Sequence, residues 1–164
     1  MLTVGDRVVY PMHGAGVIEA VEEHEVMGER REYFILTMPC GGMRVMIPLD
    51  NVEHVGLREV ICETEVDNVF CTLRMAPTQA CVNWNRRFNI NLAKIKSGNI
   101  HEVAEVVRNL TIQDRAKKLS TGERRLLDTA RQILVSELVL VLRKDAEAIA
   151  ERLDSVFADL PVGG

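Results

Sequence analysis

The chain has 164 residues, of which 47% are hydrophobic and 27% are charged, and its formal net charge is −4. These values exclude a disordered or fibrous protein, and they allow one ordinary globular domain or two small ones. Residues 1–10 lack the basic start and apolar run of a signal peptide, and the longest apolar stretch, 133–142, is about half as long as a membrane span. We therefore expect a cytoplasmic protein without membrane attachment.

The first 62 residues have the pattern of short strands separated by turns. The expected strands cover 8–10, 17–21, 33–38 and 43–48, with a last short strand within 57–62. Four or five short strands with Gly-rich turns predict a small antiparallel barrel or curled sheet. About 60 residues bury only a modest core, so we expect the outer surface of this domain to bind a partner.

From residue 63 the hydrophobic period becomes helical. Thr64 and Asp67 resemble a capping box, and Pro77 ends the first helix. The second helix contains Trp84 and ends at residues 97–98, and Asn99 begins the third. Further helix starts are expected at Ser120, in a capping box with Glu123, and near Asp145. The long helix after Ser120 is apolar nearly all round in its second half, so it should lie at the centre of the bundle.

These patterns predict an α+β protein, with a small antiparallel β barrel over 1–62 and a bundle of about five helices over 63–164. Charge divides in the same way, because 1–62 has five Lys or Arg against ten Asp or Glu, whereas 63–164 has fifteen against fourteen. Between Asp67 and Glu102 there is no acidic residue, and 68–118 has nine basic side chains against three acidic ones. This window predicts a basic surface suited to phosphate contact.

No pattern of residues indicates an active site. The four histidines (His13, His24, His54 and His101) lie in no metal-binding or nucleophile motif, and Gly14 and Gly16 do not form a dinucleotide loop. The cysteines Cys40, Cys62, Cys71 and Cys81 show no C-x-x-C spacing, which favours reduced thiols over disulfides or a metal site. We expect no catalytic residues, no metal and no cofactor, and a hydrolase or metal enzyme remains a minor alternative.

Trp84 is the only tryptophan, and Asn83, Asn85, Arg86 and Arg87 surround it. Trp84, Phe88 and Leu92 are spaced by four residues, so the indole could cap the buried stripe of its helix. Alternatively, an exposed indole beside guanidinium groups could insert at a base step in the DNA minor groove while Arg86 and Arg87 contact phosphates.

The whole chain resembles the CarD/CdnL family of bacterial regulators that bind RNA polymerase. The resemblance rests on several segments spread along the sequence: Val4-Gly5-Asp6, Val8 to Pro11 with His13-Gly14, Ile47-Pro48, Asn83-Trp84 with Arg86-Arg87, Ser97-Gly98, Val103 to Arg108, Leu119-Ser120 with Gly122-Glu123, and Ala130 to Leu134. The N-terminal segment alone is less specific, because the polymerase-interaction domain of the transcription-repair coupling helicase shares it.

The resemblance implies a Tudor-like domain that binds the β subunit of RNA polymerase by pairing strand edges. It also implies a helical domain whose tryptophan wedges into the minor groove at the upstream edge of the melted promoter and stabilises the open complex. The predicted DNA-binding residues are Trp84, Arg86, Arg87, Lys94 and Arg124. The predicted polymerase-binding residues are His24, Val26, Arg44 and Met46, with 33–38 and 43–47 as the polymerase-facing strands.

This sequence departs from the family in its charge. Family members have arginines where this chain has His24 and Met46, and a basic residue where it has Asn89. Arg44 can replace part of that charge, because residues two apart on a strand share a face. We expect a monomeric, nucleoid-associated factor without enzymatic activity. The alternative is a protein-interaction module without direct DNA contact, which the acidic first half favours.

Overall fold

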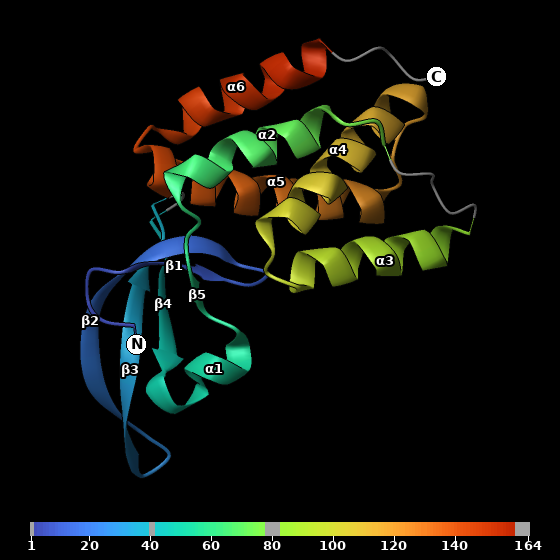
Figure 1. The fold of residues 1–164 in the computed structure, drawn as a ribbon. Helices are drawn as coiled ribbons and strands as arrows, with labels where there is room; N and C mark the ends of the chain where they lie inside the picture. The colour runs from blue at the N-terminus through green and yellow to red at the C-terminus, as the bar shows by residue number, and fades with distance from the viewer. Residues whose placement is uncertain (1, 40–41, 78–82, 160–164) are drawn as a thin grey trace.

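The computed structural model describes residues 2–39, 42–77 and 83–159. An antiparallel sheet built from the first half of the chain lies against one end of a group of helices built from the second half (Figure 1). The predicted α+β class is confirmed. In the described part of the chain, no helix is long and apolar enough to cross a membrane.

The sheet is open. Its strands are β1 (Arg7–Tyr10), β2 (Gly14–Val26), β3 (Glu29–Thr37), β4 (Arg44–Pro48) and β5 (Arg58–Glu59), in the order β4-β3-β2-β1-β5. Because β4 and β5 stay at opposite edges, the described strands form a curled sheet and not a closed barrel. The strand expected within 57–62 shortens to the two residues of β5, whereas β2 extends well beyond the predicted 17–21.

One face of the sheet packs on a small core of Val8, Ile18, Phe34, Leu36, Met38 and Ile47. A short helix, α1 (Val52–Val55), contributes partly buried valines to this core. The β2–β3 hairpin turns at Met27 and Gly28, whose φ angles of 51° and 82° are both left-handed. Two consecutive left-handed residues are typical of a type I′ hairpin turn, which matches the right-handed twist of the strands.

The helical half contains α2 (Val66–Arg74), α3 (Trp84–Lys96), α4 (Ile100–Ala116), α5 (Thr121–Leu142) and α6 (Ala146–Ala158). The expected five helices of this half are therefore present in the described residues. Side chains cap the N-termini of four of them, since Asn83, Asn99, Ser120 and Asp145 each accept a hydrogen bond from a backbone N–H of the following turn.

The two predicted capping boxes are wrong in different ways. A 3-10 turn at Glu63–Glu65 precedes α2, so Glu65 takes the N-cap position and no side chain caps that helix. At α5 the Ser120 hydroxyl caps the helix as predicted, but the Glu123 carboxylate bonds Arg87 and Gln113. It does not complete the reciprocal bond of a capping box.

The central helix is α5, as expected. Leu126, Leu127, Ala130, Leu134 and Leu138 of α5 are all buried in the main core, and α5 packs against α3, α4, α6 and the strand β2. In Figure 1 it passes behind α2 and α4. This one helix therefore contacts both halves of the molecule.

The sheet and the helices meet at a polar contact that we call the domain junction (Arg7, Ala15, Arg58, Ile61, Ser136, Glu137 and Leu140). Arg58 donates two hydrogen bonds to the Glu137 carboxylate, at 2.9 and 2.8 Å, and a third to the Gly98 carbonyl at 2.7 Å. The Ile61 backbone N–H donates to the same carboxylate at 2.9 Å. These bonds satisfy Glu137, of which only 1% is exposed.

Two further bonds strengthen the domain junction from the β1–β2 side. The backbone N–H of Ala15 donates to the Ser136 hydroxyl at 2.8 Å, and an Arg7 nitrogen donates to the Leu140 carbonyl at 2.5 Å. Gly14 has a φ of 112°, and a Cβ there would lie 2.7 Å from the Ser136 oxygen. The structure thus fixes the relative orientation of the two halves, which the sequence left open.

Candidate functional site

Trp84 is the first residue of α3, a helix that lies at the margin of the helical half (Figure 1). Its position follows from Asn83, whose side-chain oxygen accepts the Arg86 backbone N–H at 3.1 Å and so caps the helix. The indole stacks on Phe88, with ring centroids 5.0 Å apart and ring planes 19° from parallel. The indole Nε1 donates to the Ser120 hydroxyl at 3.1 Å.

The Trp84 side chain is not enclosed by the bundle, because 41% of the residue is exposed. One ring face packs on Phe88, as the four-residue spacing predicts, and much of the rest faces solvent. This geometry is compatible with the wedge hypothesis, since an inserting ring needs an exposed edge and a fixed orientation. The DNA contact itself stays a prediction.

Arg86 and Arg87 point to different surroundings, because consecutive helix residues lie about 100° apart around the axis. Arg86 is exposed, and no ion pair involves its side chain within the described parts of the chain. Arg87 is only 20% exposed at its side chain and donates to Glu123, 1% exposed, at 2.6 Å. The geometry favours a phosphate contact for Arg86 and a structural role for Arg87, which the sequence pattern did not separate.

The other two predicted DNA-binding cations are also paired with acids. Lys94 contacts Glu105 of α4 at 2.8 Å, and Arg124 contacts Asp114 of α4 at 2.7 Å. The hydrogen bond between Arg124 and Asp114 lowers the pKa of Asp114 and raises the pKa of Arg124. The backbone N–H of Leu119 also lowers the pKa of Asp114. Two cations of the acid-free window, Arg87 and Lys94, are therefore paired, because α4 and α5 bring acids to them from later in the sequence.

Three residues that sequence analysis did not assign to the site contact Trp84 or its helix. Phe88 stacks on the indole, Ser120 accepts its N–H, and Gly122 lies against both rings. Ser120 and Gly122 had a local signal as part of a helix start. No local pattern could connect them to a tryptophan 36 residues earlier.

The four predicted polymerase-binding residues lie on one face of the sheet. In the register, Ile35 of β3 pairs with Met46 on one side and Ala20 on the other, and His24 follows Ala20 at an even spacing. His24, Val26, Arg44 and Met46 therefore share the outer face, opposite the small core. Val26 and Met46 are each 46% exposed.

Arg44 and His24 have acidic neighbours on this outer face. The Arg44 guanidinium lies 3.6 Å from Glu19 and 3.8 Å from Glu22, both on β2. His24 packs edge-on against Tyr33 and approaches Glu22 at 3.6 Å. Arg44 and Met46 do share a face, as the two-residue spacing predicts, but the positive charge of Arg44 is already shared with two glutamates.

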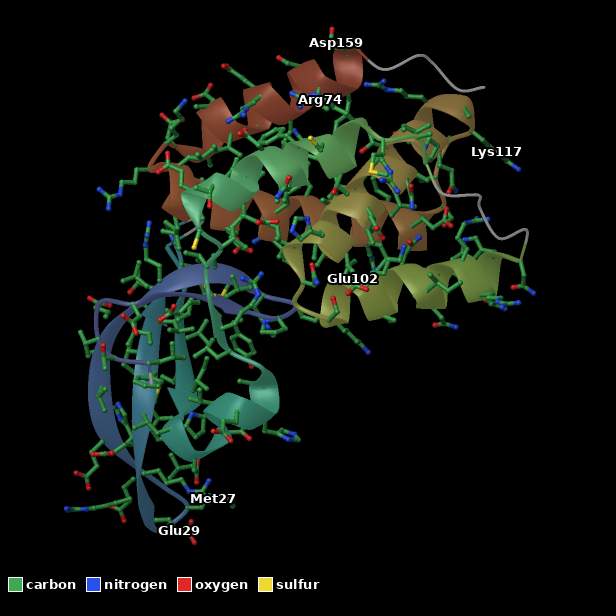
Figure 2. The ribbon with its side chains drawn as sticks, viewed as in Figure 1. Met27, Glu29, Arg74, Glu102, Lys117 and Asp159 are labelled. Atoms are coloured by element: carbon green, nitrogen blue, oxygen red, sulfur yellow. The ribbon has the colours of Figure 1, made fainter. Side chains whose placement is uncertain are left out.

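Only one of the two strands predicted to face the polymerase has a free edge. β3 is hydrogen-bonded on both sides, to β2 and β4, whereas β4 lies at the edge of the sheet. An added strand can pair only with unpaired backbone groups, so β4 can accept one and β3 cannot. The β2–β3 hairpin projects away from the helices, and at its tip Met27 is 99% exposed (Figure 2).

Within the described residues, no three His, Cys, Asp or Glu side chains lie close enough together to hold a metal ion. The described cysteines, Cys62 and Cys71, are free thiols. Cys40 and Cys81, which we also expected to be reduced, lie outside the described residues.

Comparison with known proteins gave matches over both halves. The family model "CarD-like/TRCF RID domain" matches residues 2–61, and the model "CarD, C-terminal domain" matches residues 68–154. A putative transcription factor of Bacillus subtilis (strain 168), YdeB, is 38% identical over 141 residues, covering 86% of this chain and 92% of that protein. The solution structure of the 72-residue N-terminal domain of Myxococcus xanthus CarD is 36% identical, covers 36% of this chain and 79% of that one, and has a TM-score of 0.32.

Proposed function

This chain belongs to the CarD family, which makes it a transcription regulator, and from that premise we propose that it binds RNA polymerase through its sheet and contacts promoter DNA through α3. The proposed result is a longer-lived open promoter complex. The observation that favours it most is the half-exposed, oriented indole of Trp84 beside the exposed Arg86.

The DNA contact is proposed to be independent of base sequence. Trp84 inserts beside a distorted base step in the minor groove, and Arg86 contacts a neighbouring phosphate. Both residues lie in the first turn of α3, where the helix dipole also favours a negatively charged group. Arg87 holds this turn in place through Glu123, and Lys94 and Arg124 act only where phosphate displaces their carboxylate partners.

The polymerase contact is proposed for the free edge of β4 and the adjoining outer face. Main-chain pairing at β4 supplies affinity, and Val26, Arg44 and Met46 supply side-chain contacts. The match to the polymerase-interaction domain family over residues 2–61 supports this assignment. The β subunit is the proposed partner.

The two contacts support each other energetically. A ligand shifts an equilibrium only by its different affinities for the two states, so a contact made only with opened DNA favours the open complex. A gain of about 1.4 kcal/mol changes the closed-to-open equilibrium tenfold. Binding to polymerase makes the DNA contact effectively intramolecular, so a weak contact by α3 is sufficient. Nothing in this scheme requires catalysis, a metal or a cofactor.

The DNA proposal is tested by the lifetime of open complexes formed by polymerase holoenzyme on a linear promoter fragment. Trp84→Ala should shorten the lifetime to that measured without the protein, and Arg86→Ala should shorten it partly. Ile90→Ala is the matched control, because Ile90 is a similarly exposed apolar residue of the same helix, 43% exposed. An unchanged lifetime with Trp84→Ala would exclude the wedge.

The polymerase proposal is tested by binding of the purified enzyme to the immobilised protein. Met46→Asp should remove most binding, because it places a charge beside the β4 edge. Met75→Asp is the control, since Met75 is also an exposed methionine, 60% against 46% for Met46, and lies just after α2. Equal binding by both variants would place the polymerase contact elsewhere.

A second candidate, a protein-interaction module without DNA contact, is favoured by one observation. Three of the predicted phosphate-binding cations, Arg87, Lys94 and Arg124, have acidic partners within the protein. The two functions differ in salt dependence, because each neutralised phosphate contributes a slope of about one in a log–log plot. A lifetime effect that does not change with salt would favour the second function.

A further inference from the structure

The first turn of α5 meets the first turn of α3 at three points, which together we call the α3–α5 contact (Trp84, Arg87, Ser120, Gly122 and Glu123). Ser120 bonds the indole N–H, Gly122 lies against the rings, and Glu123 bonds the Arg87 guanidinium. Ser120, the N-cap of α5, and Gly122 and Glu123 of its first turn lie within four consecutive positions of the sequence. The start of α5 therefore contacts both the indole of Trp84 and the helix turn that carries it.

Ser120 has two simultaneous hydrogen-bonding roles. Its hydroxyl oxygen accepts the Trp84 Nε1–H at 3.1 Å and the Glu123 backbone N–H at 3.2 Å. A hydroxyl has two acceptor lone pairs, so both bonds can form at once. The indole N–H is a donor only, and a single acceptor in a fixed direction selects one orientation of the ring.

Gly122 makes room for the ring in that orientation. A Cβ at this position would lie 3.3 Å from Cζ2 of Trp84, closer than ordinary contact, and 3.4 Å from Cε2 of Phe88, at the lower limit of ordinary contact. Glycine is unfavourable inside a helix relative to alanine, so its presence in the first turn of α5 is contrary to helix propensity. The space left for the two stacked rings supplies a reason.

Glu123 fixes the backbone that carries the indole. It is 1% exposed and accepts hydrogen bonds from Arg87 at 2.6 Å and from Gln113 at 2.8 Å. Because an unpaired buried carboxylate is strongly unfavourable, this pair holds the first turn of α3 against α5.

From these contacts we infer that the start of α5 is a positioning element for Trp84, in which Ser120 and Gly122 set the orientation of the indole before DNA is bound. The effect of this positioning on DNA binding rests on the proposed DNA contact of Trp84. An oriented ring loses less conformational freedom on insertion, so DNA binding is stronger than it would be with a mobile ring. Ser120 and Gly122 are positioning residues and need not touch DNA.

The orientation is measured first in the free protein. Trp84 is the only tryptophan, so nitrogen-edited NMR gives a single indole N–H signal and fluorescence quenching reports on a single ring. Ser120→Ala should shift the indole N–H signal, accelerate its exchange with water and increase acrylamide quenching. Ser120→Thr should restore all three values, because threonine keeps the hydroxyl and also caps helices.

Asp145→Ala is the matched control for loss of a helix cap. Asp145 caps α6 by accepting the Ala148 N–H at 2.8 Å, and it has no contact with Trp84. The Asp145→Ala variant should therefore destabilise the protein about as much as Ser120→Ala does, without moving the indole signal. An unchanged signal in Ser120→Ala, or an equal change in both variants, would overturn the inference.

Gly122→Ala provides a second test that does not depend on losing a cap. Alanine favours the helix, so folding should be retained while the new methyl group displaces the rings. The indole signal should shift and the open-complex lifetime should fall. A wild-type signal and lifetime in this variant would contradict the inference.

The functional part is measured by open-complex lifetime on the same promoter fragment. Ser120→Ala should shorten the lifetime roughly two- to tenfold, the range expected for one net hydrogen bond. Asp145→Ala and Ser120→Thr should not. If Trp84→Ala shortens the lifetime but Ser120→Ala does not, the positioning inference fails and the proposed function stands. If Trp84→Ala has no effect, the proposed function itself fails.

Discussion

Near each of its ends, α5 is bonded to another element of the fold through a buried glutamate. Near its N-terminus Glu123 accepts a hydrogen bond from Arg87 of α3, and near its C-terminus Glu137 accepts two from Arg58 of the sheet. Both glutamates are 1% exposed, and they lie about 20 Å apart along the helix. At each end a buried carboxylate determines where another element must lie, because the charge is tolerated only with its partner in place.

Different bonds support the two glutamates. The domain junction adds Ile61, Ala15 with Ser136, and Arg7 with Leu140 to the Arg58–Glu137 pair. The α3–α5 contact adds the Gln113–Glu123 bond and the Ser120–Trp84 bond. The sheet is therefore joined to α5 by a redundant set of bonds. A change at the junction should alter how the sheet sits on the helices, whereas a change at the α3–α5 contact should alter the surroundings of Trp84.

The largest effect is expected from Arg58→Ala. It leaves the buried Glu137 carboxylate with the Ile61 N–H as its remaining hydrogen bond at the junction, and it should lower the free energy of unfolding by about 3–5 kcal/mol. Chemical denaturation measures this change. Arg131→Ala is the control, because it removes a pair whose acidic partner, Asp154, is 68% exposed, and its effect should stay under about 1 kcal/mol. Equal losses of stability in the two variants would mean that the Arg58–Glu137 pair contributes no more than an exposed ion pair.

Arg87→Ala should have the next largest effect. The hydrogen bonds of a charged buried group contribute about 2–3 kcal/mol, and Gln113 remains as a partner for Glu123. Polymerase binding should be unchanged, because the junction is intact, while the Trp84 fluorescence should change. Loss of polymerase binding in this variant would show that the two ends of α5 are not independent.

Gly14→Ala separates backbone strain from crowding at the junction. Gly14 and Gly28 both have left-handed φ angles, so alanine at either position should lower stability by about 1 kcal/mol. A Cβ at Gly14 also meets the Ser136 hydroxyl, whereas nothing lies within 4 Å of a Cβ at Gly28. The Gly14 variant should therefore unfold at a lower denaturant concentration than the Gly28 variant. The reverse order would contradict the close approach of β2 to α5.

The smallest effect is expected at Asp114, beside the N-terminal end of α5. The hydrogen bond from Arg124 lowers the pKa of Asp114, followed in effect by the backbone N–H of Leu119. A carboxyl whose pKa is lower in the folded state stabilises the fold above its unfolded pKa of about 4, and this contribution is lost as the pH falls through the folded value. Asp114→Asn should therefore reduce the loss of stability below pH 4. An unchanged pH profile would mean that the pair contributes nothing.

Much of the local structure could be predicted from the sequence. The α+β order, the caps at Asn99, Ser120 and Asp145, and the central position of α5 all follow from residue type and spacing. These features depend on contacts within one or two turns, where hydrogen-bond geometry and hydrophobic period are set by neighbouring residues.

The pairing of charges and the orientation of the indole were decided only by tertiary structure. Sequence counting predicted a basic surface over 68–118, but Glu105 and Glu123 pair with Lys94 and Arg87 of that window from other helices, and Asp114 pairs with Arg124 beyond it. Likewise, Ser120 has a recognisable local role as a cap, and its bond to Trp84 spans 36 residues. Ion pairs and ring contacts act over a few ångströms, so they are specified by which helices pack together, and that packing depends on the whole core.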